Sequence, residues 1–247
     1  WNKKGSATDF SEAQYFTTMK EAWKMEELVT NHAAIMDKYD PQKKIALIVD
    51  EWGGWYDVEP NTNPGFLYQQ NTMRDAMIAG LTLNIFNNHA DRVRIANLAQ
   101  CVNVLQAVIL TDKEKMILTP TYHVMEMYNV HQDAKLLPIK IITNDYVLAD
   151  DKLPAVSASA SKDASGKTHI SLTNIDTKNA QTITVNLDGG QYTAVTGRIL
   201  TSSKLNNYNS FNEPNKITPA AFSGASLKAN TVSVKLPPFS VVVLELK

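Results

Sequence analysis

Cysteine is almost absent from this chain of 247 residues, because Cys101 is the only one. A single cysteine forms neither an internal disulfide nor a cysteine metal cluster, which excludes the small disulfide-stabilised secreted domains. Net charge is lacking as well, because 24 Lys and Arg residues are balanced by 25 Asp and Glu residues. A formal charge of -1 provides no electrostatic footprint for nucleic acid or for an anionic membrane surface. We therefore expect neither nucleic acid nor a membrane as a partner.

Long hydrophobic runs and cofactor motifs are missing too. The longest uncharged apolar stretch, from Ile95 to Thr111, is short for a bilayer span and contains four amide side chains. The sequence has no HExxH, Walker, GxGxxG or Gly-x-Ser-x-Gly motif, and its five histidines lack the spacing of metal ligands. We expect no metal and no cofactor. Cys101 follows an apolar segment, which favours a buried small hydrophobe over a nucleophile.

The start of the chain carries no targeting signal. Trp1 opens into a polar run, without an initiating Met or a signal peptide, so a processed or truncated start is expected. The cytoplasm and the periplasm both remain open as locations.

Composition changes near residue 135. All 8 Met and all 4 Trp residues lie before this point, and alternating β-branched residues with Ser, Thr and Asn-rich turns follow it. This change predicts a domain boundary, with one domain at residues 1–135 and a second at 136–247.

Helical and strand patterns alternate in the first half. We expect a helix that begins at Asp9 or Ser11 and ends before Pro41, a strand buried on both faces at 45–49, a helix at 67–88, a strand at 93–96 and a helix at 120–131. This order is typical of βα units around a parallel sheet. A full (β/α)8 barrel needs about 250 residues, so the first half is predicted to form only its last strands and helices. A small standalone α/β domain is the alternative.

The second half alternates with the period of a β-strand. Half-buried strands are predicted at 169–175, 182–187, 192–195, 231–236 and 240–246, with turn residues between them. Several short strands of this kind indicate an antiparallel β-sandwich. The predicted fold class is therefore α/β plus all-β: the end of a barrel followed by a sandwich.

Three side chains near the two predicted parallel strands are candidates for chemistry. Glu51 follows a strand at the position where barrel enzymes place reactive groups, although a strand-end acid also caps helices or pairs with Arg. Trp55 is suited to stacking on a sugar ring or to filling a core. Gln100 both donates and accepts hydrogen bonds, which suits a hydroxyl-rich ligand and also suits a helix cap. Residues of one strand alternate between faces, so only one of Asp50 and Glu51 is expected to face the barrel mouth.

Several spaced segments together resemble the α-L-arabinofuranosidases of glycoside hydrolase family 51. They cover nearly the whole chain: IVDEWGGWY at 48–56, NPG at 63–65, LYQQNT at 67–72, HADRV at 89–93, NLAQ at 97–100, LTPTYHV at 118–124, GRIL at 197–200, NSF at 209–211 and LPPFSV at 236–241. The resemblance implies a (β/α)8 barrel with a β-sandwich, and retaining hydrolysis of non-reducing α-L-arabinofuranosyl residues without a metal. It implies that Glu51 is the nucleophile on the seventh strand, that Trp55 lies beside the arabinose and that Gln100 binds sugar hydroxyls.

The resemblance also identifies what the sequence does not contain. The family's acid/base Glu follows an Asn on the fourth barrel strand, and no such segment is present, so the first six strands would lie upstream of Trp1. We therefore expect the chain alone to be inactive or nearly so. Its expected partner is a homo-oligomer or another chain that supplies the missing barrel strands. The alternative is a catalytically inactive fragment that binds sugar or mediates oligomer contacts. Arabinan, arabinoxylan and oligosaccharides all remain possible substrates.

Overall fold

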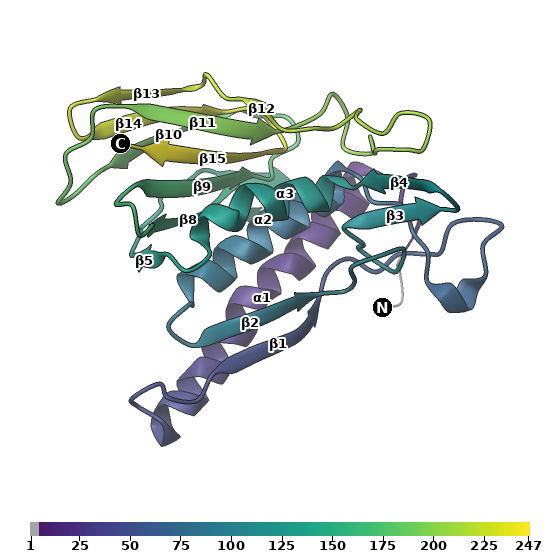
Figure 1. The fold of residues 1–247 in the computed structure, drawn as a ribbon, viewed down its shortest axis with the longest axis horizontal. Coiled ribbons are helices and arrows are strands. Elements are labelled where there is room, and N and C mark those ends of the chain that lie inside the picture. Colours follow the sequence, from purple (N-terminus) through teal and green to yellow (C-terminus); the bar gives the residue numbers. More distant parts are fainter. Residues whose placement is uncertain (1–4) are drawn as a thin grey trace.

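The structure is a computed structural model and describes residues 5–247 (Figure 1), so the predicted processed start at Trp1 lies outside the described residues. Its helices are α1 (Glu12–Tyr39), α2 (Met73–Asn88) and α3 (Pro120–Tyr128), with short 3-10 helices η1 (Pro64–Phe66) and η2 (Asn129–His131). Among residues 5–247, no helix is long and apolar enough to cross a membrane.

Most of the regular structure is sheet. The strands are β1 (Leu47–Trp52), β2 (Val93–Leu98), β3 (Ile109–Asp112), β4 (Lys115–Leu118), β5 (Lys135–Leu137), β6 (Asp145–Leu148), β7 (Asp151–Pro154), β8 (Val156–Lys162), β9 (Thr168–Asn174), β10 (Gln181–Asn186), β11 (Val195–Leu200), β12 (Ala220–Ala221), β13 (Ala225–Lys228), β14 (Thr231–Leu236) and β15 (Ser240–Leu246).

The long first helix forms where the sequence predicts it. Ser11 caps α1 by accepting from the backbone N–H of Gln14, and the Gln14 side chain accepts in return from the Ser11 N–H. This reciprocal capping box satisfies two N–H groups that the helix itself leaves without a partner. The helix ends at Tyr39, two residues before Pro41, because proline cannot continue a helix.

β1, α2 and β2 form a parallel strand pair with a helical crossover. Leu47 lies opposite Val93, and Trp52 lies opposite Leu98. α2 begins at Met73, later than the predicted Leu67, because Thr72 caps it and the preceding residues form a loop. In that loop Leu67 has a left-handed backbone with φ of 53°, which ends η1 and excludes a continuous helix.

The prediction that the first strand is buried on both faces is wrong. Leu47 and Val49 pack against the core, whereas Ile48 is 47% exposed and its neighbour Ile95 on β2 is 49% exposed. α1 and α2 cover one face of the pair (Figure 1). Among residues 5–247, no element buries the other face, so its isoleucines stay in contact with solvent.

The second half contains two larger antiparallel sheets and a two-stranded antiparallel sheet of β6 and β7. One larger sheet has the strand order β12-β11-β15-β9-β8-β5, and the other has the order β10-β14-β13. The strands predicted at 231–236 and 240–246 are confirmed as β14 and β15, and those at 169–175 and 182–187 are confirmed with a shift of one residue. The expectation that the strand at 169–175 is half-buried is wrong, because every residue of β9 is buried. The strand expected at 192–195 is wrong, because β11 begins only at Val195. Thr193 and Ala194 instead hydrogen-bond the Lys247 carbonyl with their N–H groups.

One apolar core joins the helices to the six-stranded sheet. α2 packs against β8, β9 and β15, with Gly80 at the closest approach. A Cβ at Gly80 would lie 2.4 Å from Thr173 Oγ1, so only glycine permits this contact. The predicted boundary between residues 135 and 136 falls inside β5, whose Lys135 pairs with Lys162 of β8. The division into two domains stays a prediction.

Candidate active site

The candidate residues lie where β1 and β2 end. Glu51 is the next-to-last residue of β1, and Gln100 follows β2 by two residues. Parallel neighbours bring their carboxyl ends to the same edge, and the Ala99 N–H donates to the Trp52 carbonyl at 2.9 Å. Glu51 and Gln100 are both exposed at this edge, so a ligand from solvent has access to both side chains.

The two tryptophans of this segment have different surroundings. Trp52 is 5% exposed, and its ring lies 5.8 Å from the Phe86 ring in an edge-to-face arrangement. Trp52 is thus a core residue that anchors the end of β1 on α2. Trp55, three residues further on, is only partly buried. Trp52 therefore fills the core, whereas Trp55 keeps part of its surface exposed to solvent.

The segment 53–56 follows β1 and contains Trp55, and two buried glutamines hold it. The Gly54 N–H donates to Gln106 Oε1 at 2.6 Å. Gln69 donates from Nε2 to the Gly54 carbonyl at 3.0 Å and accepts from the Tyr56 N–H at 2.8 Å. The backbone on either side of Trp55 is therefore fixed by side chains that belong to other segments.

Gln106 extends this network to the end of β2. Its Nε2 donates to the Asp75 carbonyl at 2.9 Å and to Thr121 Oγ1 at 3.1 Å, while its own N–H donates to the Ala99 carbonyl at 3.0 Å. Through its side chain and its backbone N–H, one residue thus links both strand ends to α2 and α3. Gln69 and Gln106 were not predicted from the sequence. Gln106 stands between the apolar Leu105 and Ala107, which was the one available signal, whereas Gln69 is followed by a second amide, Gln70.

Two buried ionisable residues, Arg74 and Asp75, lie at the start of α2. Burial raises the pKa of Asp75 to about 6, although the neighbouring Arg74 guanidinium opposes the shift. Asp75 Oδ2 accepts from the Thr72 N–H at 2.7 Å. The Arg74 guanidinium carbon lies 3.8 Å from the centre of the Phe10 ring and 3.6 Å from that of the Tyr56 ring. The Arg74 guanidinium therefore packs against Tyr56, the last residue of the segment 53–56.

The expectation that Cys101 is a buried small hydrophobe is wrong. It is exposed, not buried, because the apolar segment leaves the sheet at Leu98 and turns back toward the hairpin of β3 and β4. Its carbonyl accepts from the Ile109 N–H at 3.1 Å, which makes its backbone part of that turn.

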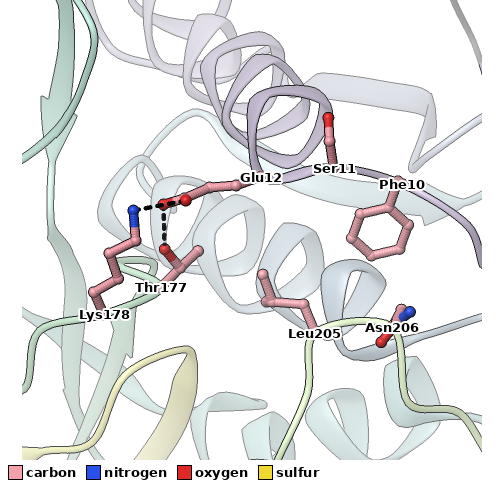
Figure 2. Close-up of a pocket in the computed structure, with 7 residues that line it drawn as sticks. All are labelled: Phe10, Ser11, Glu12, Thr177, Lys178, Leu205 and Asn206. Atoms are coloured by element: carbon pink, nitrogen blue, oxygen red, sulfur yellow. Dashed lines mark hydrogen bonds and ion pairs between the residues drawn. The ribbon is translucent and has the colours of Figure 1, made fainter.

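A cavity of about 290 Å³ lies between the start of α1 and two loops of the second half, away from the strand ends (Figure 2). Glu12 forms an ion pair of 2.7 Å with Lys178 and accepts from Thr177 Oγ1 at 2.6 Å. These contacts lower the pKa of Glu12, with the Lys178 hydrogen bond as the largest cause. None of the sequence-predicted site residues lines this cavity.

Comparisons with known proteins identify the family of the chain. The model of the α-L-arabinofuranosidase C-terminal domain matches residues 50–240. An intracellular exo-α-L-arabinofuranosidase of Bacteroides ovatus is 50% identical over 245 residues, which make up 99% of this chain and 48% of that protein. An intracellular exo-α-(1→5)-L-arabinofuranosidase of Streptomyces lividans is 25% identical over 87% of the chain and 35% of its own length.

Solved structures give the same result. The family 51 arabinofuranosidase of Xanthomonas axonopodis pv. citri superposes with a TM-score of 0.98 at 50% identity, over the whole chain and 50% of that protein. The family 51 enzyme of Bifidobacterium longum, at 22% identity and a TM-score of 0.81, shares the fold. The chain spans about half the length of these relatives. It therefore belongs to the α-L-arabinofuranosidase C-terminal domain family and corresponds to the carboxyl-terminal part of a family 51 arabinofuranosidase.

Proposed function

We propose that the chain supplies half of the active site of a retaining exo-α-L-arabinofuranosidase. The observation that carries the proposal is the common edge at which Glu51 and Gln100 are exposed, with Trp55 on the hydrogen-bonded segment that follows β1. A carboxylate, an amide and an aromatic face at one strand edge suit a sugar with several hydroxyls. In this proposal β1 and β2 are the seventh and eighth strands of a (β/α)8 barrel, and the two larger antiparallel sheets form the sandwich.

Each side chain has one role in the proposed reaction. A Glu51 carboxylate oxygen attacks the anomeric carbon of an arabinofuranosyl residue, and the glycosidic C–O bond breaks to leave a covalent ester. A second carboxylic acid protonates the departing oxygen and then takes a proton from the water that hydrolyses the ester. Gln100 binds the sugar hydroxyls, and Trp55 packs beside the ring. No metal takes part in these steps.

The second carboxylic acid is not assigned to any residue of this chain. General acid–base help contributes roughly 10²–10⁴-fold to rate, so the chain by itself is expected to turn over very slowly or not at all. In the proposed assembly, the acid comes from the half of the relatives that the chain does not match. The relative from Bacteroides ovatus is named as intracellular, and we assign the same location to the activity proposed here.

Hydrolysis of 4-nitrophenyl α-L-arabinofuranoside tests the proposal. The chain is assayed alone and after mixing with the separately produced amino-terminal half of the Xanthomonas enzyme. We expect nitrophenol release from the mixture at least about 10²-fold above the chain alone. Glu51→Gln removes the nucleophile and should abolish this release.

The matched control is Glu27→Gln, the same change at an exposed position of α1. It should leave the release unchanged. Turnover that survives Glu51→Gln would exclude Glu51 as the nucleophile. A mixture that forms a stable complex without turnover would exclude the proposed division of the active site.

A further inference from the structure

The segment that carries Trp55 lies beyond the end of strand pairing. The pairing of β1 with β2 ends where Trp52 lies opposite Leu98. Gly53 follows with φ of 130°, a backbone conformation that favours glycine, and the chain leaves the direction of the strand there. The peptide groups on either side of Trp55 therefore need hydrogen-bond partners from outside the sheet.

One side-chain amide bonds to both of these peptide groups. Gln69 Nε2 donates to the Gly54 carbonyl at 3.0 Å, and Gln69 Oε1 accepts from the Tyr56 N–H at 2.8 Å. In a parallel sheet, the N–H and the carbonyl of one residue bond in the same way to the two residues that flank the residue opposite. The Gln69 amide therefore takes the place of a neighbouring strand around Trp55.

Burial makes these hydrogen bonds hard to replace. Gln69 is 1% exposed, and Gln106, which accepts from the Gly54 N–H, is 0% exposed. Tyr56, at the other end of the segment, is 4% exposed. A buried N–H or carbonyl without a partner keeps the full cost of its lost hydration. The hydrogen-bonded arrangement of the backbone around Trp55 is therefore strongly favoured over others.

Gln69 is itself held by the loop to which it belongs. The Leu105 N–H donates to the Leu67 carbonyl at 2.9 Å, two residues before Gln69. The Gln70 N–H donates to Glu59 Oε1 at 3.0 Å, one residue after it. A side chain orients another group accurately only when its own position is fixed by its surroundings. These bonds give Gln69 such a position.

We propose that Gln69 is a positioning residue for Trp55, and that it determines how well the site binds the arabinofuranosyl ring. The inference rests on the proposed function, in which Trp55 packs beside the sugar. Gln69 acts through Trp55, because a side chain that is 1% exposed offers a ligand almost no surface to contact. A displacement of about 1 Å in a substrate-positioning group costs about 10²-fold in rate.

Gln69→Met tests the inference first on the chain alone. Methionine has a similar length but leaves the Gly54 carbonyl and the Tyr56 N–H without their partner. We expect the indole N–H signal of Trp55 in the nuclear magnetic resonance spectrum to shift or broaden. Loss of this signal in Trp55→Phe identifies it.

Gln69→Glu keeps the size of the side chain and serves as the rescue variant. Burial raises the pKa of a carboxyl group, so this glutamate is neutral at low pH and donates to the Gly54 carbonyl as the amide does. At about pH 5, we expect its Trp55 signal to match that of the unmodified chain at the same pH. A Trp55 signal that stays displaced at this pH would contradict the positioning role.

Kinetics of the assembled enzyme provide the second test. The chain is again mixed with the amino-terminal half of the Xanthomonas enzyme and assayed with 4-nitrophenyl α-L-arabinofuranoside. Gln69→Met should raise KM by about tenfold or more and change kcat less, because a contact beside the ring is made in the bound substrate and in the transition state alike. In a Trp55→Ala background, Gln69→Met should have little further effect, since its action depends on Trp55.

The matched control is Gln181→Met, the same change at a glutamine of β10 that is 3% exposed and accepts from Asn144 Nδ2. It also removes a buried amide, but it should move neither the Trp55 signal nor KM. Circular dichroism establishes that each variant is folded. An unchanged Trp55 signal in Gln69→Met, or effects of Gln69→Met and Trp55→Ala on KM that multiply, overturns the inference. Failure of the proposed function appears differently, as a Gln69-dependent Trp55 signal without any Glu51-dependent release of nitrophenol.

Discussion

Gln106 serves both strand ends at once. Its side chain accepts from Gly54 next to Trp55, and its backbone holds Ala99 next to Gln100. A fully buried amide in this position fixes the spacing between two candidate ligand groups. The chain thus uses side-chain hydrogen bonds, where strand pairing has already ended, to define the candidate site.

Gln106→Leu should destabilise the folded chain. Leucine has a similar size but leaves the buried Gly54 N–H without an acceptor, which costs about 1–3 kcal/mol. Urea unfolding followed by circular dichroism measures the change. The control, Gln132→Leu at an exposed position, should stay within about 0.5 kcal/mol of the unmodified chain. Equal effects of the two substitutions would mean that the Gln106 network adds nothing to stability.

Asp75 makes stability depend on pH. Its folded-state pKa of about 6 lies above the value of about 3.9 for an unfolded chain. The stability that Asp75 contributes by holding its proton is therefore complete below pH 4 and is lost as the pH rises through 6. Asp75→Asn abolishes this titration and keeps an oxygen that can accept from the Thr72 N–H. The free energy of unfolding of the unmodified chain should fall relative to the variant by up to about 3 kcal/mol between pH 4 and 7.

His131 titrates in the opposite direction over the same range. Burial lowers its pKa to about 4, so its contribution to stability is lost as the pH falls. Both the unmodified chain and Asp75→Asn contain this histidine, and its effect cancels in their difference. A difference in unfolding free energy that stays constant from pH 4 to 7 would contradict the role given to Asp75.

α2 packs closely against β9 because Gly80 has no side chain at the point of contact. Alanine is a better helix former than glycine by about 1 kcal/mol, so propensity alone predicts that Gly80→Ala stabilises the protein. The Cβ would meet Thr173 Oγ1 at 2.4 Å and Val241 Cγ2 at 3.0 Å, and overpacking of this kind costs about 1–3 kcal/mol. We expect net destabilisation in thermal unfolding. Thr173→Ala, which removes the closest atom, should have a smaller cost in the Gly80→Ala background than alone.

Elements with strong local signals were predictable from the sequence. The capping box at Ser11 and Pro41 beyond the last turn define α1, while the alternating residues of β14 and the β-branched apolar run of β15 define those strands. The start of α2 and the start of β11 were not predictable, because loop hydrogen bonds set them. β8 was also missed. Its serines alternate with valine and alanine, but small residues of this kind have little strand propensity, and the structure buries both faces of the strand.

The candidate site was predictable only in part. Glu51, Trp55 and Gln100 stand out because they follow apolar strand segments, and they remain predictions as functional residues. Gln69 and Gln106 act through contacts between distant segments, which no local pattern encodes. The exposure of Cys101 has the same origin, since it depends on where the loop turns after β2.

The strand pair of β1 and β2 has one face that no described element covers. Ile48 and Ile95 on this face are 47% and 49% exposed, and among the described residues neither outer edge of the pair is joined to another strand. Exposed apolar faces and unpaired edges promote association. We expect the chain alone to self-associate with rising concentration in sedimentation velocity. The double substitution Ile48→Thr with Ile95→Thr should reduce this, because threonine keeps the strand propensity and removes apolar surface.

Val147→Thr provides the control for this experiment. Val147 is 60% exposed on β6, outside the strand pair, and its replacement should leave the sedimentation profile unchanged. A double variant that sediments like the unmodified chain would show that association, if any, uses another surface.

The shared core under α2 has a consequence for recombination between genes. The same helix crosses over from β1 to β2 with one face and covers β8, β9 and β15 with another. Recombination at residue 135 would join sequences from two parents inside β5, which pairs with β8. It would also place Gly80 of α2 and the Thr173 that it contacts on segments from different parents. Chimeras joined there inherit one half of an interface from each parent. We therefore expect recombination to preserve the helical half and the sheet-rich half together, because each half packs against the other.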